Sequence, residues 1–354
     1  MIIEKQRYPI MIALALSVLF VMTTTQGIAA ELTLRVHHFL GEESLPHQML
    51  IEPWAERIES ASNGRIEVEI YPAMTLGGRA PALVEQVREG AVDIIWTAAA
   101  YTPGRFPRTE VFTLPMVHQG DPVATNLAIM ETLGQGLIED FEGLHPLLIH
   151  VHSGHALHMG KGPVTRMEDF TGLTLRPPGR GVGSWTIQAL GADTTKKRHP
   201  KLPKALENGA LDGALMSFQL AQTMGVVEAV KSHTLLGEEE YFGTSIYLFL
   251  MNKARYDALP EELRAVIDRN SGQRLAREIG GIWREAGNAA LAAARKRGNR
   301  IDVLSGEALH NAHQALQGVL NRWMKEVDKQ QINGPHLIKK AREAVERNTR
   351  AMAR

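Results

Sequence analysis

The sequence predicts an α/β protein made of two lobes with a similar plan. The chain has 354 residues, more than one average domain. Strand and helix signals alternate in the order β-α-β-α-β, and the same order returns further along the chain. Hydrophobic residues make up 44% and charged residues 22%. This composition is typical of a soluble globular protein and argues against disorder.

The first unit opens with Leu32, Leu34 and Val36, which alternate with polar residues as in a strand. The alternation of Ile66, Val68 and Ile70 with glutamates indicates a second strand with one solvated face. The expected elements are, in order, a strand over 32–36, a helix between 46 and 63, a strand over 66–70, a helix between 81 and 89, and a buried strand over 91–96.

The second unit repeats this order. Its expected elements are a strand over 172–176, a short helix over 184–190, a strand over 192–195, a helix over 202–207 and a strand over 210–216. The segment Glu-Gly-Ala-Val-Asp at 89–93 is echoed by Asn-Gly-Ala-Leu-Asp at 208–212. In both, a glycine that can take the left-handed conformation joins a helix end to a buried strand. The echo favours two lobes of one plan.

Beyond the apolar run at 247–251 the sequence becomes helical. One long helix is expected to begin at Leu259-Pro260-Glu261-Glu262, and further helices pass through Trp283 and Trp323. The segment after Pro335 is basic on balance, so we expect a solvated helix face or a frayed end there.

Charge and cysteine content exclude several classes of function. Lys plus Arg and Asp plus Glu each number 39, so the chain has no net charge and we predict no nucleic-acid partner. The absence of cysteine excludes disulfides, thiolate metal sites and cysteine nucleophiles.

The N-terminus predicts export. Lys5 and Arg7 precede an apolar run from Ile10 to Met22, and small residues follow up to Ala30. This order is typical of a secretory signal peptide over residues 1–30, cleaved near Ala30. The apolar run is shorter than the roughly 20 residues that a spanning helix needs. We therefore expect a soluble mature protein outside the cytoplasmic membrane.

Arg176 is the strongest candidate for ligand binding. It lies at the carboxyl end of a predicted strand, directly before Pro177-Pro178. Ligands of open α/β sheets bind outside such strand ends, and a guanidinium matches a carboxylate with two parallel hydrogen bonds. The alternative, an arginine paired with a structural glutamate, stays open at this point.

Histidines cluster at positions 145, 150, 152, 155 and 158. His150 and His152 are expected on one strand face, and His155 and His158 one helical turn apart, a spacing that could hold zinc. Carboxylates are absent between His145 and His158, and no His-Glu-x-x-His motif exists. Neutral histidines that donate to a ligand, or that are solvated, are therefore favoured, and we predict no metal.

Other motifs exclude nucleotides and serine hydrolysis. The loop Gly179–Ser184 precedes a predicted helix, but its glycine spacing matches neither the dinucleotide nor the Walker motif. No Gly-x-Ser-x-Gly elbow is present. We predict no cofactor. Trp96 and Tyr101 follow the third strand and could line a pocket, although core packing is the alternative.

Several segments, taken together in their order and spacing, resemble the extracytoplasmic solute-binding proteins of tripartite ATP-independent periplasmic (TRAP) transporters. The resemblance extends roughly from Leu32 to Val327. The segments that carry it are 64–72, 76–78, 86–94, 112–116, 167–176, 190–192 and 205–213.

The resemblance implies a type II periplasmic-binding-protein fold, in which two α/β lobes close on a ligand and a long helix connects them. It implies lobe I over 31–152 plus 242–281, lobe II over 153–241 plus 282–331, and a basic C-terminal helical tail over 332–354. It also implies a monomer in the periplasm that is not an enzyme. Its membrane partners would be a small and a large integral subunit driven by an ion gradient.

The family's carboxylate anchor maps onto Arg176. The residues expected to shape the rest of the site are His38, Trp96, Tyr101, His155, Met216, Phe218 and Phe242. Ala156 stands where some sugar-acid binders have a second arginine, and the apolar run Ala214-Leu215-Met216 replaces polar residues of many relatives. These departures imply a ligand with one carboxylate and a less polar body.

The ligand could still be an aromatic acid, a hydroxy or keto acid, or a dicarboxylate. The basic run Lys196–His199 replaces a more conventional strand and adds positive charge near the cleft or hinge. Two other functions remain as alternatives: a secreted enzyme that uses the histidines or a metal, and a ligand-binding sensor component.

Overall fold

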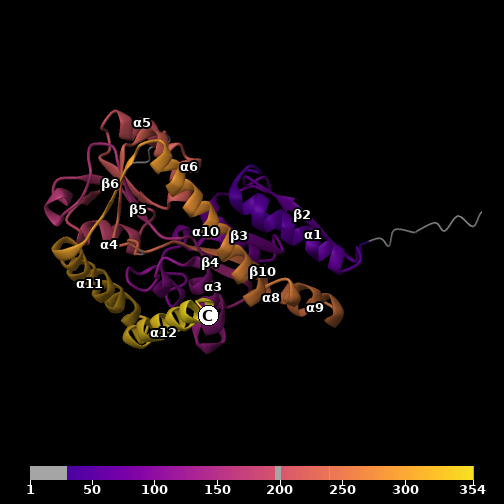
Figure 1. Cartoon of the computed structure of the whole chain (residues 1–354). Helices are drawn as coiled ribbons and strands as arrows, with labels where there is room; N and C mark the ends of the chain where they lie inside the picture. Colours follow the sequence, from indigo (N-terminus) through magenta and orange to yellow (C-terminus); the bar gives the residue numbers. More distant parts are fainter. Residues whose placement is uncertain (1–29, 196–200, 239, 354) are drawn as a thin grey trace, which may run out of the picture.

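The computed structural model describes residues 30–195, 201–238 and 240–353, which form two lobes around two β-sheets (Figure 1). The predicted signal peptide up to residue 29 and the basic run Lys196–His199 lie outside the described residues. Among the described residues, no helix combines the length and the apolar character needed to cross a membrane.

Lobe I is built on a five-stranded sheet with the order β2-β1-β3-β10-β4. Its strands are β1 (Leu32–His38), β2 (Ile66–Tyr71), β3 (Ile94–Ala98), β4 (Leu144–Val151) and β10 (Ile246–Asn252). Lobe II is built on a six-stranded sheet with the order β11-β9-β5-β8-β6-β7. Its strands are β5 (Ala156–Met159), β6 (Thr174–Arg176), β7 (Asp193–Thr194), β8 (Gly213–Met216), β9 (Ser232–Leu235) and β11 (Arg300–Val303).

Helices cover both sheets. They are α1 (Glu52–Ala61), α2 (Leu83–Arg88), α3 (Pro122–Thr132), α4 (Val182–Ala189), α5 (Leu202–Glu207), α6 (Phe218–Thr223), α7 (Val226–Ala229), α8 (Lys253–Asp257), α9 (Glu261–Arg269), α10 (Gly272–Lys296), α11 (Gly306–Asp328) and α12 (Gly334–Met352). Single turns comprise the π-helical η1 (His47–Ile51) and the 3₁₀ turns η2 (Ala80–Ala82), η3 (Ala99–Tyr101), η4 (Thr109–Thr113), η5 (Leu133–Gln135), η6 (Leu137–Phe141) and η7 (Met167–Phe170).

The repeated plan predicted from the sequence is confirmed in the strand order. In lobe I, β1 pairs in parallel with both β2 and β3. In lobe II, β6 pairs in parallel with both β7 and β8. The orders β2-β1-β3 and β7-β6-β8 are therefore equivalent, as two copies of the predicted β-α-β-α-β unit require.

The echoed segments end in aspartates that form equivalent hydrogen bonds in the two lobes. The Asp93 carboxylate accepts a hydrogen bond from the backbone N–H of Arg35 at 2.8 Å, and Asp212 accepts one from Thr174 at 2.7 Å. Each aspartate also donates its own N–H to the carbonyl of the same partner. In each lobe the aspartate carboxylate thus adds a hydrogen bond to the pairing of two parallel strands, one residue before the second strand begins. For this reason β3 starts at Ile94, later than the predicted start at 91.

The expectation of one long helix from Leu259 is wrong. Helix α9 ends at Arg269, and α10 begins at Gly272 after a break. The Asn270 side-chain amide donates to the Val266 carbonyl at 2.9 Å, and Gly272 has a φ of 66°. The left-handed conformation, which glycine adopts at little cost, redirects the chain there.

Two extended segments cross between the lobes, one from β4 to β5 and one from β9 to β10. They are hydrogen-bonded to each other: the His155 N–H donates to Gly243 at 2.7 Å, and the Phe242 N–H donates to His155 at 3.0 Å. The long helix α10 packs against α3 and β4 of lobe I and against α6 of lobe II (Figure 1). Two hydrogen-bonded crossing segments next to a helix that contacts both lobes form a hinge about which the lobes can rotate.

The C-terminal segment forms helix α12, which packs against α3. Its inner face is apolar and buried at Ile338, Ala341 and Val345, spaced as one face of a helix. Arg347 forms an ion pair with Glu131 of α3 at 2.6 Å. This end of the chain is therefore docked on lobe I, whereas the sequence suggested a solvated or frayed end.

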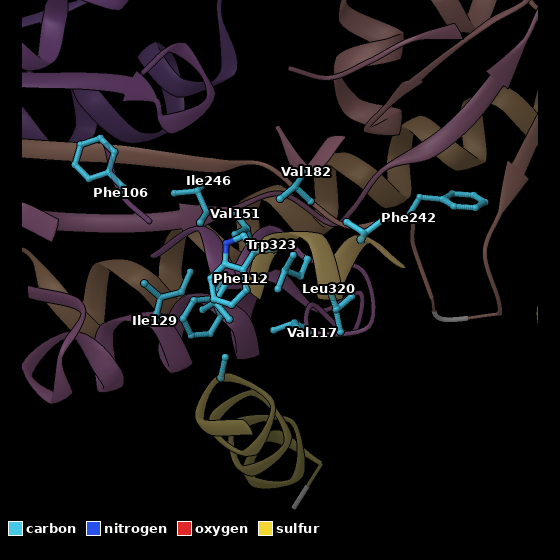
Figure 2. Close-up of a cluster of buried hydrophobic side chains, with 14 of the residues drawn as sticks. Phe106, Phe112, Val117, Ile129, Val151, Val182, Phe242, Ile246, Leu320 and Trp323 are labelled. Atoms are coloured by element: carbon cyan, nitrogen blue, oxygen red, sulfur yellow. The ribbon is translucent and has the colours of Figure 1, made fainter. Parts of the chain in front are cut away.

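One hydrophobic cluster is common to both lobes. Figure 2 shows part of it, with Val151 from β4, Val182 from α4 and Trp323 from α11 among its members. Each lobe also has a cluster of its own, around Trp54 in lobe I and around Phe218 in lobe II. The shared cluster joins the lobes on the side of the crossing segments and α11.

We predict that Asp212→Ala destabilises the protein by about 1–3 kcal/mol, because it leaves the Thr174 N–H without its acceptor. Although burial opposes it, the bonds from Lys161 and the Thr174 amide hold the pKa of Asp212 below its ordinary value. Urea unfolding measures the change. Asp328→Ala, which removes an exposed carboxylate on α11, is the matched control. Equal stability of the two variants would contradict the assigned role.

Candidate functional site

Arg176 is the last residue of β6, where pairing with Ala214 of β8 fixes its backbone. The side chain is partly buried, and its Nη1 is fully buried without a hydrogen-bond partner in residues 30–195, 201–238 and 240–353. Among the described residues, no carboxylate forms an ion pair with it. The alternative of an arginine paired with a structural glutamate therefore fails within that part of the chain.

Tyrosines of lobe I approach this guanidinium from the other side of the gap. Burial lowers the pKa of Arg176, and the phenol groups of Tyr101 and Tyr247 are close enough to oppose that shift. Burial in turn raises the pKa of Tyr247, so its phenol is neutral at physiological pH. In the part of the chain that the structure describes, the surroundings of Arg176 are polar and aromatic but carry no compensating charge.

Four aromatic side chains from three segments of lobe I form one stack. Trp96 stacks on Phe39 and on Tyr247, with ring centroids 5.5 and 5.0 Å apart, and Tyr101 meets Phe39 edge-on at 5.0 Å. Offset and edge-to-face contacts at these distances are favourable. Trp96 is only 1% exposed, whereas Tyr101 is 42% exposed. Trp96 thus supports the wall from behind, and Tyr101 presents its ring to solvent.

The Trp96 indole N–H donates to Nε2 of His150 at 3.1 Å, so that nitrogen carries no proton. Burial lowers the pKa of His150 to about 3. The histidine is therefore a neutral acceptor that fixes the tryptophan ring.

His152 and His155 both lie in the crossing segment between β4 and β5, and both contact Ser245 of the other crossing segment. His155 Nε2 is 3.0 Å from the Ser245 hydroxyl, and the Gly154 N–H donates to His152 Nδ1 at 2.9 Å. Burial lowers the pKa of His155 to about 3, and His118 and Arg176 add repulsion. Neutral imidazoles thus connect the two crossing segments, through the contact between the His155 and Ser245 side chains.

The expected helical spacing of His155 and His158 is wrong, because β5 is a strand. His158 belongs instead to a chain of bonds inside lobe II. Its Nε2 is 3.1 Å from the Met216 carbonyl, its Nδ1 is 2.7 Å from Nδ1 of His233, and Nε2 of His233 is 2.9 Å from the Asn299 amide nitrogen. The carbonyl can only accept and the amide N–H₂ can only donate. Every atom is therefore satisfied when both histidines are neutral.

Two further histidines of lobe I also have structural partners. His38 is fully buried with Nε2 3.0 Å from Nδ1 of His47, and His145 stacks on Tyr256. Within residues 30–195, 201–238 and 240–353, no group of three metal-ligating side chains is placed to hold a metal ion.

The structure brings Arg176, Tyr101 and His155 to one region between the lobes, with Trp96 behind them. The other predicted contacts lie in hydrophobic clusters: Met216 and Phe218 in the cluster of lobe II, and Phe242 in the shared cluster. His38, directly before Phe39 in the chain, is fully buried against His47. The ligand contacts assigned to these residues stay a prediction.

The sequence reasoning missed Phe39, Tyr247 and Ser245. Tyr247 opens the apolar run of β10, so only its position at a strand end distinguished it. Phe39 directly follows β1, and no motif marks it. Ser245 is notable only through its bond to His155.

A cavity lies next to His155 between the lobes. From lobe I it is lined by Ala99, Ala100 and residues that follow η3, from lobe II by residues 178–180, 182 and 183, and from the second crossing segment and the start of β10 by residues 244–246. Glu110 of η4 also lines it. Burial raises the pKa of Glu110 to about 7, although the nearby Trp323 opposes this shift. The cavity therefore lies between the segments that follow β3 and β6, and Arg176 itself is not part of its lining.

Comparison with known proteins identifies a family for this arrangement. Residues 36–326 match the model for bacterial extracellular solute-binding protein, family 7 (DctP). A curated solute-binding protein from Verminephrobacter eiseniae is 27% identical over 244 residues, which cover 68% of this chain and 70% of the relative.

Solved structures agree. A marine metagenome TRAP solute-binding protein specific for aromatic acid ligands, in complex with 3-hydroxybenzoate, has a TM-score of 0.83 and 34% identity, covering 90% of this chain and 99% of its own. A TRAP solute-binding protein from Rhodoferax ferrireducens, in complex with copurified benzoate, has a TM-score of 0.81 and 31% identity, with the same coverage. The predicted two-lobed fold and the predicted family are confirmed.

Buried neutral histidines predict an acid-sensitive fold. Burial is the main cause that holds the pKa values of these histidines at about 4 (His38, His118, His233) or about 3 (His150, His155, His158), against about 6.5 in an unfolded chain. Their contribution to stability is complete above about pH 6.5 and is lost as the pH falls towards the folded pKa values.

We expect the free energy of unfolding to drop by several kcal/mol between pH 7 and pH 5, at about 1.4 kcal/mol per pH unit for each proton taken up only by the unfolded chain. Urea titrations at a series of pH values measure it. His310→Asn, at an exposed position of α11, should leave the slope unchanged. A flat profile over this range would contradict the neutral assignment.

Proposed function

This chain belongs to family 7 of the bacterial extracellular solute-binding proteins, and we propose that it captures an aromatic carboxylate for a TRAP transporter. Its relatives of known structure are solute-binding proteins and not enzymes. TRAP solute-binding proteins bind small carboxylates and work with integral membrane subunits.

One observation carries the proposal: Arg176 places a buried, unpartnered guanidinium nitrogen at the gap between the lobes. A buried charge without a counterion is costly. A ligand carboxylate would remove this cost and form charge-assisted, bidentate hydrogen bonds with the guanidinium. Arg176 is therefore the anchor of the bound acid.

The aromatic wall supports an aromatic body for the ligand. Phe39, Tyr101 and Tyr247 are partly exposed on a stack that Trp96 holds rigid. A planar ring beside such a wall gains offset or edge-to-face contacts in addition to the burial of apolar area. The two relatives crystallised with 3-hydroxybenzoate and with benzoate, each more than 30% identical, favour the same ligand class.

The neighbours of Arg176 favour a single carboxylate. His155 stands beside the anchor, but its lowered pKa keeps the ring uncharged at neutral pH. It can donate or accept one hydrogen bond, yet it supplies no second positive charge. A dicarboxylate would bury its second charge against neutral rings, which is unfavourable.

Capture would proceed by closure of the two lobes. The bound acid adds differential contacts to the closed state and so shifts an existing open–closed equilibrium. Closure removes water, which strengthens the attraction between the carboxylate and the guanidinium. The closed form would then be the species presented to the membrane subunits.

Family membership implies a periplasmic location. We propose that residues 1–30 are the signal peptide, with cleavage near Ala30, and that the mature protein acts as a monomer. Delivery to a small and a large membrane subunit completes the transport role.

Thermal shift with a panel of acids tests the ligand class. Benzoate and 3-hydroxybenzoate should raise the unfolding temperature, since a ligand at a hundredfold its Kd adds about 2.7 kcal/mol to stability. Succinate and glucuronate should give much smaller shifts. Stabilisation by succinate or glucuronate alone would overturn the aromatic assignment.

Arg176→Ala should weaken binding of the best aromatic acid by about 2–5 kcal/mol, more than tenfold in Kd, because it removes one partner of a buried charged pair. Calorimetry measures the affinity. Arg274→Ala, at an exposed position of α10, is the matched control and should bind as the wild type does. An unchanged Kd for Arg176→Ala would reject the anchor.

A further inference from the structure

The two lobes meet closely at a glycine. Gly179 follows β6 of lobe II, and Ala100 lies in η3, directly after β3 of lobe I. A Cβ atom at residue 179 would stand 2.9 Å from the Cβ of Ala100. Real Cβ atoms essentially never approach other atoms so closely. The backbone of lobe II can therefore approach lobe I to this distance only because residue 179 has no side chain.

Gly179 is not a glycine for reasons of backbone conformation. Its φ lies outside the positive range, in contrast to Gly181, whose φ is 74°. An alanine at position 179 would therefore meet no strain of its own, and its methyl group would collide only with Ala100. The substitution Gly179→Ala therefore tests the effect of side-chain volume on lobe closure without adding backbone strain.

The loop that carries Gly179 is stiff. Pro177 and Pro178 restrict its start, and the Ser184 hydroxyl donates to the Gly179 carbonyl at 2.9 Å. A Cβ atom at Gly183 would stand 2.5 Å from the Pro178 ring, so the loop is folded tightly on itself. A displacement at residue 179 is thus passed along the chain and is not absorbed locally.

The same two segments carry the site. Arg176 lies three residues before Gly179, and Tyr101, whose phenol acts on the guanidinium, directly follows Ala100. A second contact adjoins this one, since a Cβ atom at Gly181 would stand 3.3 Å from Oε1 of Glu110. The spacing between the segments therefore sets how near the guanidinium comes to the aromatic wall.

We propose that Gly179 and Ala100 form the seam at which the lobes close, and that the missing side chain at residue 179 positions Arg176 against lobe I. The inference rests on the proposed function, because it assigns these residues to the same carboxylate site. Neither residue needs to touch the ligand. They act through the position of Arg176, by limiting how far the closed state can close.

The test combines a blocking variant with its rescue. Gly179→Ala should weaken the affinity for benzoate roughly five- to hundredfold, the range that overpacking by a methyl group implies. Adding Ala100→Gly to it removes the opposing methyl and should restore most of the affinity. Gly162→Ala, where a Cβ meets nothing within 4 Å, is the matched control. Calorimetry measures all four proteins.

Small-angle scattering supplies a readout that general destabilisation would not give. With saturating benzoate, the radius of gyration of Gly179→Ala should stay larger than that of the wild type, and the double variant should return to the wild-type value. Unchanged affinity and compaction in Gly179→Ala would overturn the seam. Weakened affinity without rescue by Ala100→Gly would also overturn it.

The outcome separates this inference from the proposed function. If the wild type binds no aromatic acid, the proposed function fails, whatever the variants do. The seam is then judged on ligand-free protein: Gly179→Ala should still be the more open form by scattering, and identical curves would reject the seam.

Discussion

The site depends on a positive charge that folding has left without a partner. Arg176 could have been neutralised by one of the many carboxylates of the chain, yet within the described residues none pairs with it. An uncompensated guanidinium lowers the stability of the free protein, and the same energy becomes available when an anion arrives. In our account, the fold serves to hold this charge at the gap between two lobes and to surround it with neutral rings.

The histidines explain how that environment stays neutral. Burial keeps these histidine rings uncharged, and several of them have structural roles. His150 fixes Trp96 and His155 bonds to Ser245 at the crossing segments, while His158 and His233 complete a chain of bonds within lobe II. Protonation of any one of them would place a donor against a donor or a charge near Arg176. Burial thus has two consequences: it keeps the histidines at the hinge neutral, and within the described part of the chain it leaves the Arg176 guanidinium free of a nearby charge until the ligand binds.

Much of the fold could be predicted because its signals are local. Alternation marked β1 and β2, and the echoed segments at 89–93 and 208–212 indicated the repeated unit. The role of the aspartates in that echo was missed, since the bonds from Asp93 and Asp212 reach residues 58 and 38 positions away. The site was harder to predict for the same reason. Arg176 was visible from its strand end, but the aromatic stack joins residues from three distant segments, and the pairing of His158 with His233 spans 75 positions.

A crystal structure of the protein with a bound aromatic acid tests the central claim most directly. The account predicts both carboxylate oxygens within about 2.7–2.9 Å of the Arg176 guanidinium nitrogens, with the ring of the acid against the wall formed by Phe39, Tyr101 and Tyr247. A ligand whose carboxylate is held elsewhere, with the Arg176 guanidinium still unpartnered, would contradict it.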